Sequence, residues 1–417
     1  MGSSTPTSSH ARHRLASAPA APAGHGHGHG PVEPASGRVR ALLALVLVPF
    51  ALATLVGVAL TWPSDNPPTA GDIGFGQRPV QGEVIATSAT PCSVDGAGTG
   101  QEPECVALTI LLRDGEASGA TIEQVLPDEP STPSFATGDR VVLAFTGGDP
   151  ADPSSYQVRD FQRGTPMLGL AVLFAAAVVL LGRWKGLASL AALGFSFGVL
   201  LVYLLPAILA GSDPVVVGVL GAGVIMFGTL YLSHGVSART STAVLGTLLS
   251  LGLIGLLGSA FSAATRLTGL GADTANLIAV LGTGIDARGL LLAGVVIGAL
   301  GVLDDVTMTQ TSAVWELRRA NPDLSSRELY TAALRIGRDH IASAVNTLAL
   351  AYAGAALPVM LAFSVSGQSF GTLITAQDVA QEVVRTLVGS IGLVAAVPIT
   401  TLIAAVVARR DEVPAVP

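Results

Sequence analysis

Long hydrophobic runs separated by short polar segments dominate the chain. Eight of them are long enough, at about 20 residues rising ~1.5 Å each, to cross the hydrocarbon core of a bilayer as helices. They are Ala41–Trp62, Pro166–Leu181, Gly186–Ala210, Pro214–Leu232, Ser241–Phe261, Gly289 to about Gln310, His340–Phe363 and Leu387–Ala408. The pattern therefore predicts an α-helical polytopic membrane protein with about eight transmembrane helices.

The first hydrophobic run, residues 41–62, differs from a cleavable signal peptide. Arg38 and Arg40 precede it, as in a signal peptide, but the run is too long for the usual apolar core. It ends at Trp62 and Pro63 without the small residues of a cleavage site. We expect an uncleaved anchor, the first transmembrane helix.

Residues 63–165 show a different pattern, in which apolar and polar positions alternate over short stretches. Five such stretches, "GEVIATSA", "CVALTILL", "ATIEQVL", "DRVVLAF" and "SYQVRDF", are separated by Gly, Pro and Asp turns. They predict a small extracytoplasmic β domain between the first and second helices. Five short strands fit a small barrel, for example an OB-like one, or a sandwich. A seven-helix membrane domain, residues 166–410, would follow.

Cys92 and Cys105, the two cysteines of the chain, both lie in the expected β domain. On the oxidising side of the membrane we expect them to form a disulfide. A free thiol pair is the alternative. A redox role lacks support, because the Cys-x-x-Cys spacing is absent.

The two ends of the chain are polar or small-residue segments. Residues 1–40 are rich in Ser, Ala, Pro and Gly, which predicts a disordered cytoplasmic tail, and residues 411–417 form a short second tail. In the first tail, "GHGHGHG" presents His25, His27 and His29 as weak candidate ligands for a divalent metal. A solvated low-complexity run is the favoured interpretation, since no second ligand cluster accompanies them.

Composition and motifs argue against several classes of enzyme. Half of the 417 residues are hydrophobic and 12% are charged, which is unusual for a soluble domain. Lys185 sits in "GRWKGL" and not in a phosphate-binding loop, and no His-Glu-x-x-His occurs. "GFSFG" frames Ser196 as in a serine hydrolase, but a mid-helix position favours helix packing through Gly194 and Gly198. We expect no enzyme activity, no cofactor and no nucleic-acid partner.

The segment "GALGVLDDVTMTQTSAVWELRR" carries two adjacent aspartates inside a hydrophobic run. On a helix, Asp305 shares a narrow stripe with small and hydroxyl residues, whereas Asp304 lies on another side with Thr307 and Thr311. The members of the stripe are Gly294, Gly298, Gly301, Asp305, Thr309, Ser312 and Glu316. Small residues allow another helix to approach closely, so we expect this stripe to face the protein interior. Asp304 would then lie nearer the lipid or the headgroups.

The following hydrophobic run supplies a matching polar face. Ser343, Asn346 and Gly354 share one side of the expected helix. Antiparallel packing would place the Asn346 amide at the depth of the Asp305 carboxyl, where it could satisfy the buried acid. In the connection, Ser325 and Glu328 have the spacing of a helix capping box, and a basic amphipathic helix is expected there, on the inner membrane surface.

Three motifs together resemble the YibE/F-like family of bacterial membrane proteins. They are "GALGVLDDVTMT", "IGRDHIASAVNTLALAYAGAALP" and "STAVLGTL", and the similarity extends roughly from Arg163 to Arg410. Members of this family usually have one Asp in the first motif, which aligns with Asp305, so Asp304 is a departure. The resemblance implies a multi-pass membrane protein with an extracytoplasmic domain, and it implies no established activity.

Two hypotheses for function follow from the polar residues within the hydrophobic runs. The first is a transporter-like or channel-like permease for a small solute or ion, since intramembrane ionisable residues usually serve function. The second is a non-catalytic envelope protein whose outer β domain binds an extracytoplasmic protein partner, with the polar residues joining helices. An intramembrane serine hydrolase is the weakest hypothesis. In each case the lipid bilayer surrounds the helices.

Charge in the connections predicts the orientation. Every second connection and the C-terminal end are basic, with Arg183, Lys185, Arg239, Arg318, Arg319, Arg327, Arg335, Arg338, Arg409 and Arg410. The connections between them have no cationic excess, so the basic ones are expected in the cytoplasm. The chain would then lie in the bacterial cell (cytoplasmic) membrane with both termini cytoplasmic.

Reporter fusions test this orientation. Alkaline phosphatase fused after residue 145 should be active, because the enzyme folds only outside the cytoplasm, and a fusion after Arg410 should be silent. Phosphatase activity normalised to the amount of fusion protein is the measurement. The reverse pattern would contradict the predicted topology.

Overall fold

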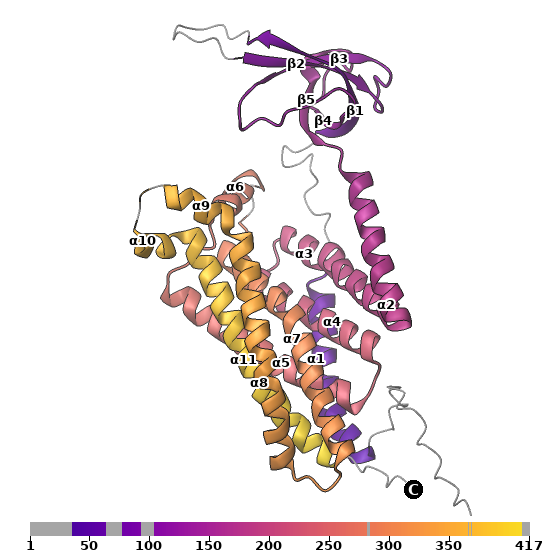
Figure 1. The fold of residues 1–417 in the computed structure, drawn as a ribbon, viewed down its shortest axis with the longest axis vertical. Helices are drawn as coiled ribbons and strands as arrows, with labels where there is room; N and C mark the ends of the chain where they lie inside the picture. Colours follow the sequence, from indigo (N-terminus) through magenta and orange to yellow (C-terminus); the bar gives the residue numbers. More distant parts are fainter. Residues whose placement is uncertain are drawn as a thin grey trace, which may run out of the picture. The chain divides into compact units, whose positions relative to one another are not determined.

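The computed structural model describes residues 36–63, 77–92, 104–281, 284–365, 367 and 369–410. It is mostly helical, with one small sheet near the N-terminus (Figure 1). The helices are α1 Gly37–Leu60, α2 Gly164–Val199, α3 Leu205–Leu209, α4 Pro214–His234, α5 Ala238–Ala264, α6 Ala272–Leu281, α7 Ala287–Ala320, α8 Ser326–Ala355, α9 Leu357–Val365, α10 Phe370–Thr375 and α11 Gln377–Arg410. A π-helical turn, Leu200–Leu204, joins α2 to α3.

Six candidate membrane spans, by length and composition, occur in the described part of the chain. They are α1, the 46-residue segment Gly164–Leu209, α4, α5, α7 and α11. Two of the eight runs expected from the sequence fall within the 46-residue segment. The run His340–Phe363 is divided between α8 and α9, because the helix breaks at Ala356, and neither piece is among the six.

Within α2 the chain changes direction sharply at Arg183 (Figure 1). Arg183 has non-helical backbone angles of φ 52° and ψ −131°. The Gly186 backbone packs against the Val178 carbonyl across this bend, where any larger side chain would collide. The bend therefore separates the two hydrophobic runs that the sequence shows as distinct.

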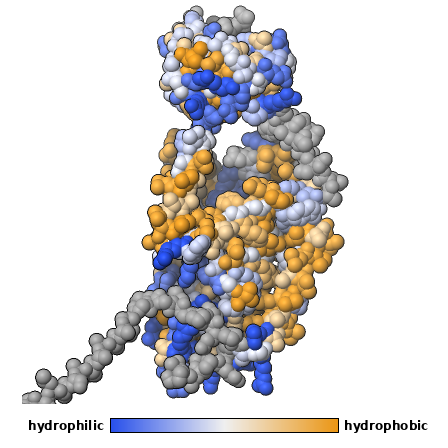
Figure 2. Space-filling view, turned by 90° about the vertical axis from the view of Figure 1, so that its right-hand side faces the viewer, coloured by the Kyte–Doolittle hydropathy of each residue, from blue (hydrophilic) through white to orange (hydrophobic). Residues whose placement is uncertain are grey.

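The core of the helical part lies between α1, α4, α5, α7 and α11. Its fully buried side chains include Met226 of α4, Ile254 of α5 and Leu303 of α7. On the outside, large hydrophobic side chains are exposed, with Leu181 at 92% and Leu45 at 72%. Figure 2 shows hydrophobic residues over much of the face of the helical part that it draws. An apolar exterior of this extent suits a lipid environment and would be unusual on a soluble protein.

The first and last long helices meet at one end of the helical part. Val39 and Leu43 at the start of α1 pack with Val407 near the end of α11. Farther along α1, the Thr61 hydroxyl lies 2.7 Å from that of Tyr203, and Gly57 packs against Leu220. The expected anchor helix is thus part of the bundle.

The capping box expected at Ser325 is confirmed. The Ser325 hydroxyl accepts from the Glu328 backbone N–H, and the Glu328 carboxylate accepts from the Ser325 N–H at 2.8 Å. Hydrogen bonds from Ser325 lower the pKa of the Glu328 carboxyl, since they stabilise its charged form. The helix that begins here, α8, continues to Ala355, so the expected basic surface helix and the following run are one continuous helix.

The sheet has five antiparallel strands in the order β3-β2-β1-β4-β5. The strands are β1 Arg78–Pro91, β2 Glu104–Leu112, β3 Thr121–Pro127, β4 Arg140–Phe145 and β5 Tyr156–Phe161. The long strand β1 pairs with β4 through its first half and with β2 through its second. A register shift between Val84 and Ala86 bends β1 at the overlap.

The sheet curls around its own hydrophobic core. Val84, Ile110, Val141 and Leu143 are fully buried in it. Gly82 lies above this core, where an added Cβ would be 2.6 Å from Ile110 Cγ2, so only glycine fits without displacement. The Gln124 amide on edge strand β3 donates to the Pro153 carbonyl, next to the opposite edge strand β5, at 2.6 Å.

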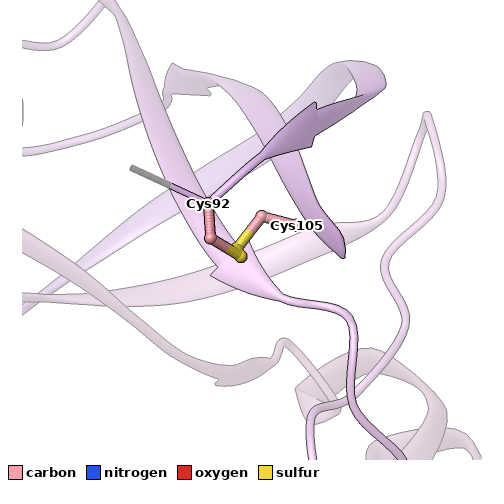
Figure 3. The surroundings of a disulfide bond; sticks show 2 residues. All are labelled: Cys92 and Cys105. Carbon is pink, nitrogen blue, oxygen red and sulfur yellow. A yellow bond between two sulfur atoms is a disulfide. The ribbon is translucent and has the colours of Figure 1, made fainter. Parts of the chain in front are cut away.

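The expected disulfide between Cys92 and Cys105 is present in the sheet (Figure 3). Cys92 directly follows β1, and Cys105 is the second residue of β2. The two Cα atoms are 5.1 Å apart and 13 positions apart in sequence. The bond therefore closes the segment that connects two paired strands.

Removing this disulfide should destabilise the sheet. In the full chain, Cys92→Ser with Cys105→Ser should lower the free energy of unfolding by about 3 kcal/mol, the loop-entropy value for a closed loop of this length. Limited proteolysis across a urea series, with cleavage sites mapped to residues 104–161, measures the shift. Thr137→Ser, on an exposed turn, is the control and should change nothing. Equal protection of the double variant and the native chain would contradict the prediction.

Candidate intramembrane polar site

One face of α7 is buried against α4, α5 and α11 and carries polar side chains among hydrophobic ones. Thr307, Gln310 and Thr311 are at most 1% exposed, beside Leu303 and Val306. The hydroxyls of Thr307 and Thr311 bond to carbonyls one turn back, at 2.8 and 2.7 Å. Threonine can satisfy itself in this way inside a helix, which makes its burial inexpensive.

Asp304 is at the edge of this buried face and turns toward α4. Its Oδ2 accepts a hydrogen bond of 2.9 Å from the Thr229 hydroxyl. Its Oδ1 is buried and has no hydrogen-bond partner among the described residues. One carboxylate oxygen is therefore held in place while the other is available for a proton, a cation or a hydrogen-bond donor.

A second group of polar side chains joins α5, α7 and α11. The Thr247 and Thr307 hydroxyls are 2.8 Å apart, and Gln310 Oε1 accepts from Thr401 at 3.0 Å. Gln310 Nε2 and Thr400 Oγ1 are buried without partners in the described part of the chain. With the Asp304 pair they form what we call the polar cluster: Thr229, Thr247, Asp304, Thr307, Gln310, Thr400 and Thr401.

Glycines bring the helices of the polar cluster close together. At Gly246 of α5 an added Cβ would collide with the Thr400 side chain. At Gly337 of α8 it would lie 2.7 Å from Gln310 Nε2 and 2.5 Å from Val397. Short interhelical distances of this kind let small polar side chains reach one another.

The prediction that Asp305 faces the interior and Asp304 the lipid is wrong. Asp305 is exposed, whereas Asp304 is partly buried and hydrogen-bonded. The physical reason is that α4, α5 and α11 pack on the side of α7 opposite the small-residue stripe. The Asp305 carboxylate lies instead within range of an electrostatic interaction with His234, as do the side chains of Lys185 and Arg239.

The other residues of the predicted stripe are mostly outside the buried face. Gly294, Gly298, Gly301 and Glu316 are exposed, and Thr309 and Ser312 are partly buried without side-chain hydrogen bonds in the described residues. No neighbour lies within 4 Å of a Cβ added at Gly301. The Tyr352 hydroxyl covers Gly298, and Arg385 lies near Gly294.

The expected partner face on α8 is likewise exposed. Ser343, Asn346 and Gly354 face outward, and Gly354 has open space around it. In the described part of the chain Asn346 makes no side-chain hydrogen bond, so the predicted pair with Asp305 does not form. The contacts of α8 with α7 and α11 run instead through residues such as Leu329, Gly337 and Leu348.

The remaining candidate residues have simple surroundings. The Ser196 hydroxyl donates to the Ala192 carbonyl at 3.0 Å, within one helix. Nothing lies within 4 Å of a Cβ added at Gly194 or Gly198, so the close helix packing expected there is absent. In the described residues no group of three or more His, Cys, Asp or Glu side chains could hold a metal ion. The candidates His25, His27 and His29 lie outside the described residues.

Most members of the polar cluster outside α7 were not singled out from the sequence. Thr229, Thr247, Thr400 and Thr401 lie in hydrophobic runs, in "FGTLYL", "VLGTLL" and "PITTLI". Thr229, Thr247 and Thr401 bond to a carbonyl of the preceding turn, as threonines in apolar helices commonly do, so they give no pattern of their own. The available signal was a polar side chain near a glycine, as in "GTL", which occurs at Gly228 and Gly246.

The fold and this site are consistent with one class, an integral membrane protein, here with six candidate spans in the described residues, a buried polar cluster and a small curled sheet near the N-terminus. Residues 170–410 match the family described as YibE/F-like protein, which is more than half of the chain. The protein therefore belongs to the YibE/F-like family, and the resemblance noted in its motifs is confirmed. Comparison with curated proteins and with solved structures gave no match.

Loss of one buried hydrogen bond should measurably weaken the helical part. Thr401→Val removes the donor to Gln310 Oε1 and leaves a buried amide with no partner on either atom. We expect a loss of about 1–2 kcal/mol, seen as a lower unfolding temperature of the detergent-purified chain. Thr347→Val is the matched control, because its hydroxyl is exposed and bonds only to the Ser343 carbonyl. Equal unfolding temperatures for both variants would contradict the role given to Thr401.

Proposed function

We propose that this protein is a transporter-like or channel-like permease for a small solute or ion, with the polar cluster as its intramembrane site. The observation that carries the proposal is the position of Asp304, a carboxyl group within a candidate membrane span, with one oxygen fixed by Thr229 and the other unpartnered. An ionisable group at such a depth costs at least ~2.5–3.5 kcal/mol when charged, so it persists where it serves a purpose.

The neighbouring polar groups favour a path lined by several polar side chains over a site made of Asp304 alone. Gln310 Nε2 is an unpaired donor and Thr400 Oγ1 an unpaired hydroxyl, both within the same bundle as the unpaired Asp304 oxygen. Unpaired buried polar atoms are costly, and each is a point where water, a proton or a solute could be bound. In this proposal Asp304 binds or releases the transported or coupled ion, and the hydroxyls of α5 and α11 solvate it. The proposal includes both termini in the cytoplasm, as the basic connections predict.

The outer sheet supports a second candidate function, binding of an extracytoplasmic partner. Its strand order and curled shape fit a partly open five-stranded barrel, and we propose an OB-like fold for it. Ile85 and Val125 are large apolar side chains exposed on this domain, at 41% and 49%. They are suitable contacts for another protein, and this role is compatible with transport by the helices.

The adjacent aspartates give a matched test of the permease proposal. A deletion strain is first screened against ions, metals, antibiotics and osmotic stress, and variants are then returned to it. Asp304→Asn should fold and reach the membrane but reduce rescue by about tenfold or more, because the amide cannot take up and release a proton or neutralise a cation. Asp305→Asn, one residue away and exposed, should rescue like the native chain.

Membrane levels measured through a C-terminal tag separate loss of function from loss of protein. Asp304→Leu should reduce both, because it leaves the Thr229 hydroxyl facing an apolar side chain. If Asp304→Asn rescues the deletion strain as well as the native chain does, the permease proposal is contradicted. In that case the polar cluster joins helices and the partner-binding role of the outer sheet becomes the better account.

A further inference from the structure

Far from the polar cluster along α11, two cavities lie side by side between α6 and α8–α11. The first, of about 470 Å³, has a mixed lining, in which Asp378, Glu382 and Arg385 of α11 lie beside apolar residues of α8, α9 and α11. The second, of about 310 Å³, is lined by hydrophobic side chains of α8, α9, α10 and α11, among them Met360, Phe370 and Leu387. Figure 1 shows α9 and α10 gathered with α6 at one end of the helical part.

The two cavities share one wall. Tyr352, Ala356, Val379 and Glu382 line both of them. A ligand that occupied both would have a charged or polar end on one side of Tyr352 and a hydrocarbon part on the other. The volumes are in the range of small-molecule sites, which are mostly apolar with a few fixed polar groups.

The charges in the polar cavity do not balance. Arg385 Nη1 pairs with Glu382 Oε1 at 2.7 Å, and the two side chains are 27% and 29% exposed. Of the charged residues in the lining, this pair leaves Asp378, in the first turn of α11, without an ion-pair partner. The Asp378 carboxylate is partly buried against the Gly271 backbone and makes no ion pair or hydrogen bond in the described part of the chain. The cavity therefore attracts one positive charge.

Tyr352 adds a further preference for a cation. Tyr352 lines both the polar and the apolar cavity, and its hydroxyl lies near Gly298 of α7. The face of an aromatic ring attracts ammonium groups, including quaternary ones, when they lie close to it. A carboxylate, an aromatic wall and an adjoining apolar cavity suit an organic cation better than a hydrated metal ion.

We propose that this is a binding site for an ammonium-bearing amphiphile, with the cationic head between Asp378 and Tyr352 and the hydrocarbon part in the apolar cavity. The site is independent of the proposed permease function and would stand if that function failed. Free organic amines and the headgroups of amine-containing lipids share this chemistry. Arg385 and Glu382 shape the site by neutralising each other.

The probe is radiolabelled octyltrimethylammonium, with binding measured on the full chain in micelles of an uncharged maltoside detergent. The native chain should bind it saturably, and octyl sulfate, of equal chain length and opposite charge, should not compete. Asp378→Asn should weaken binding by about tenfold or more, and Asp378→Glu should restore most of it. Asp323→Asn, an exposed acid in the α7–α8 connection, should have no effect.

A second variant tests the apolar half without altering any charge. Ala349→Phe fills part of the apolar cavity, so it should weaken octyltrimethylammonium severalfold and leave competition by tetramethylammonium unchanged. Added phosphatidylethanolamine identifies the source of the natural ligand. Displacement of the probe by this lipid, but not by phosphatidylglycerol, indicates a headgroup, and no displacement by either indicates a free amine.

Three results would overturn the proposal. They are absence of saturable binding by the native chain, equal competition by octyl sulfate, and unchanged affinity in a folded Asp378→Asn variant. If Asp378→Asn fails to fold, as judged by size-exclusion chromatography, native-like affinity in Ala349→Phe overturns the two-cavity site by itself. Failure here leaves the Asp304 rescue experiment unaffected, because that experiment alters neither cavity.

Discussion

The packing of one face of α7 against α4, α5 and α11 is the interaction on which the rest of the helical part depends. It buries Leu303 and Val306 together with Thr307 and Gln310, so apolar contact and polar pairing share one surface. In hydrocarbon, apolar contact gives little net preference for one helix arrangement over another. Directional hydrogen bonds between helices therefore help to fix which face of α7 points inward.

Threonine and glycine contribute to this helix packing in different ways. A threonine hydroxyl can bond to the preceding turn, so placing it inside costs little, and it can also donate to an oxygen on a neighbouring helix, as Thr401 does to Gln310 Oε1. A glycine opposite, such as Gly246 against Thr400, removes the bulk that would keep the helices apart. Asp304 depends on the same arrangement, since Thr229 can reach it only while α4 lies close to α7.

Helix α11 connects the two sites. Asp378 and Arg385 near its start line the outer polar cavity, and Thr400 and Thr401 farther along belong to the polar cluster. At ~1.5 Å per residue, Asp378 and Thr400 are about 33 Å apart along this helix, and Pro398 lies between them.

The sequence by itself determined the membrane class, the family, the sheet, the disulfide and the capping box at Ser325. These follow from local features, namely hydrophobic length, alternation, cysteine position and residue spacing. The sequence also located the acidic segment, because two adjacent aspartates within an apolar run can be recognised without a structure.

Only the tertiary structure decided which aspartate is buried. Small residues mark a face that could be packed, but a helix has several such faces, and the choice depends on where α4, α5 and α11 lie. That arrangement turned Asp304 toward Thr229 and left Asp305 and Asn346 outside. It also brought Thr247 to Thr307 and Thr401 to Gln310. These contacts join residues 60 and 91 positions apart, which the periodicity of a single helix cannot predict.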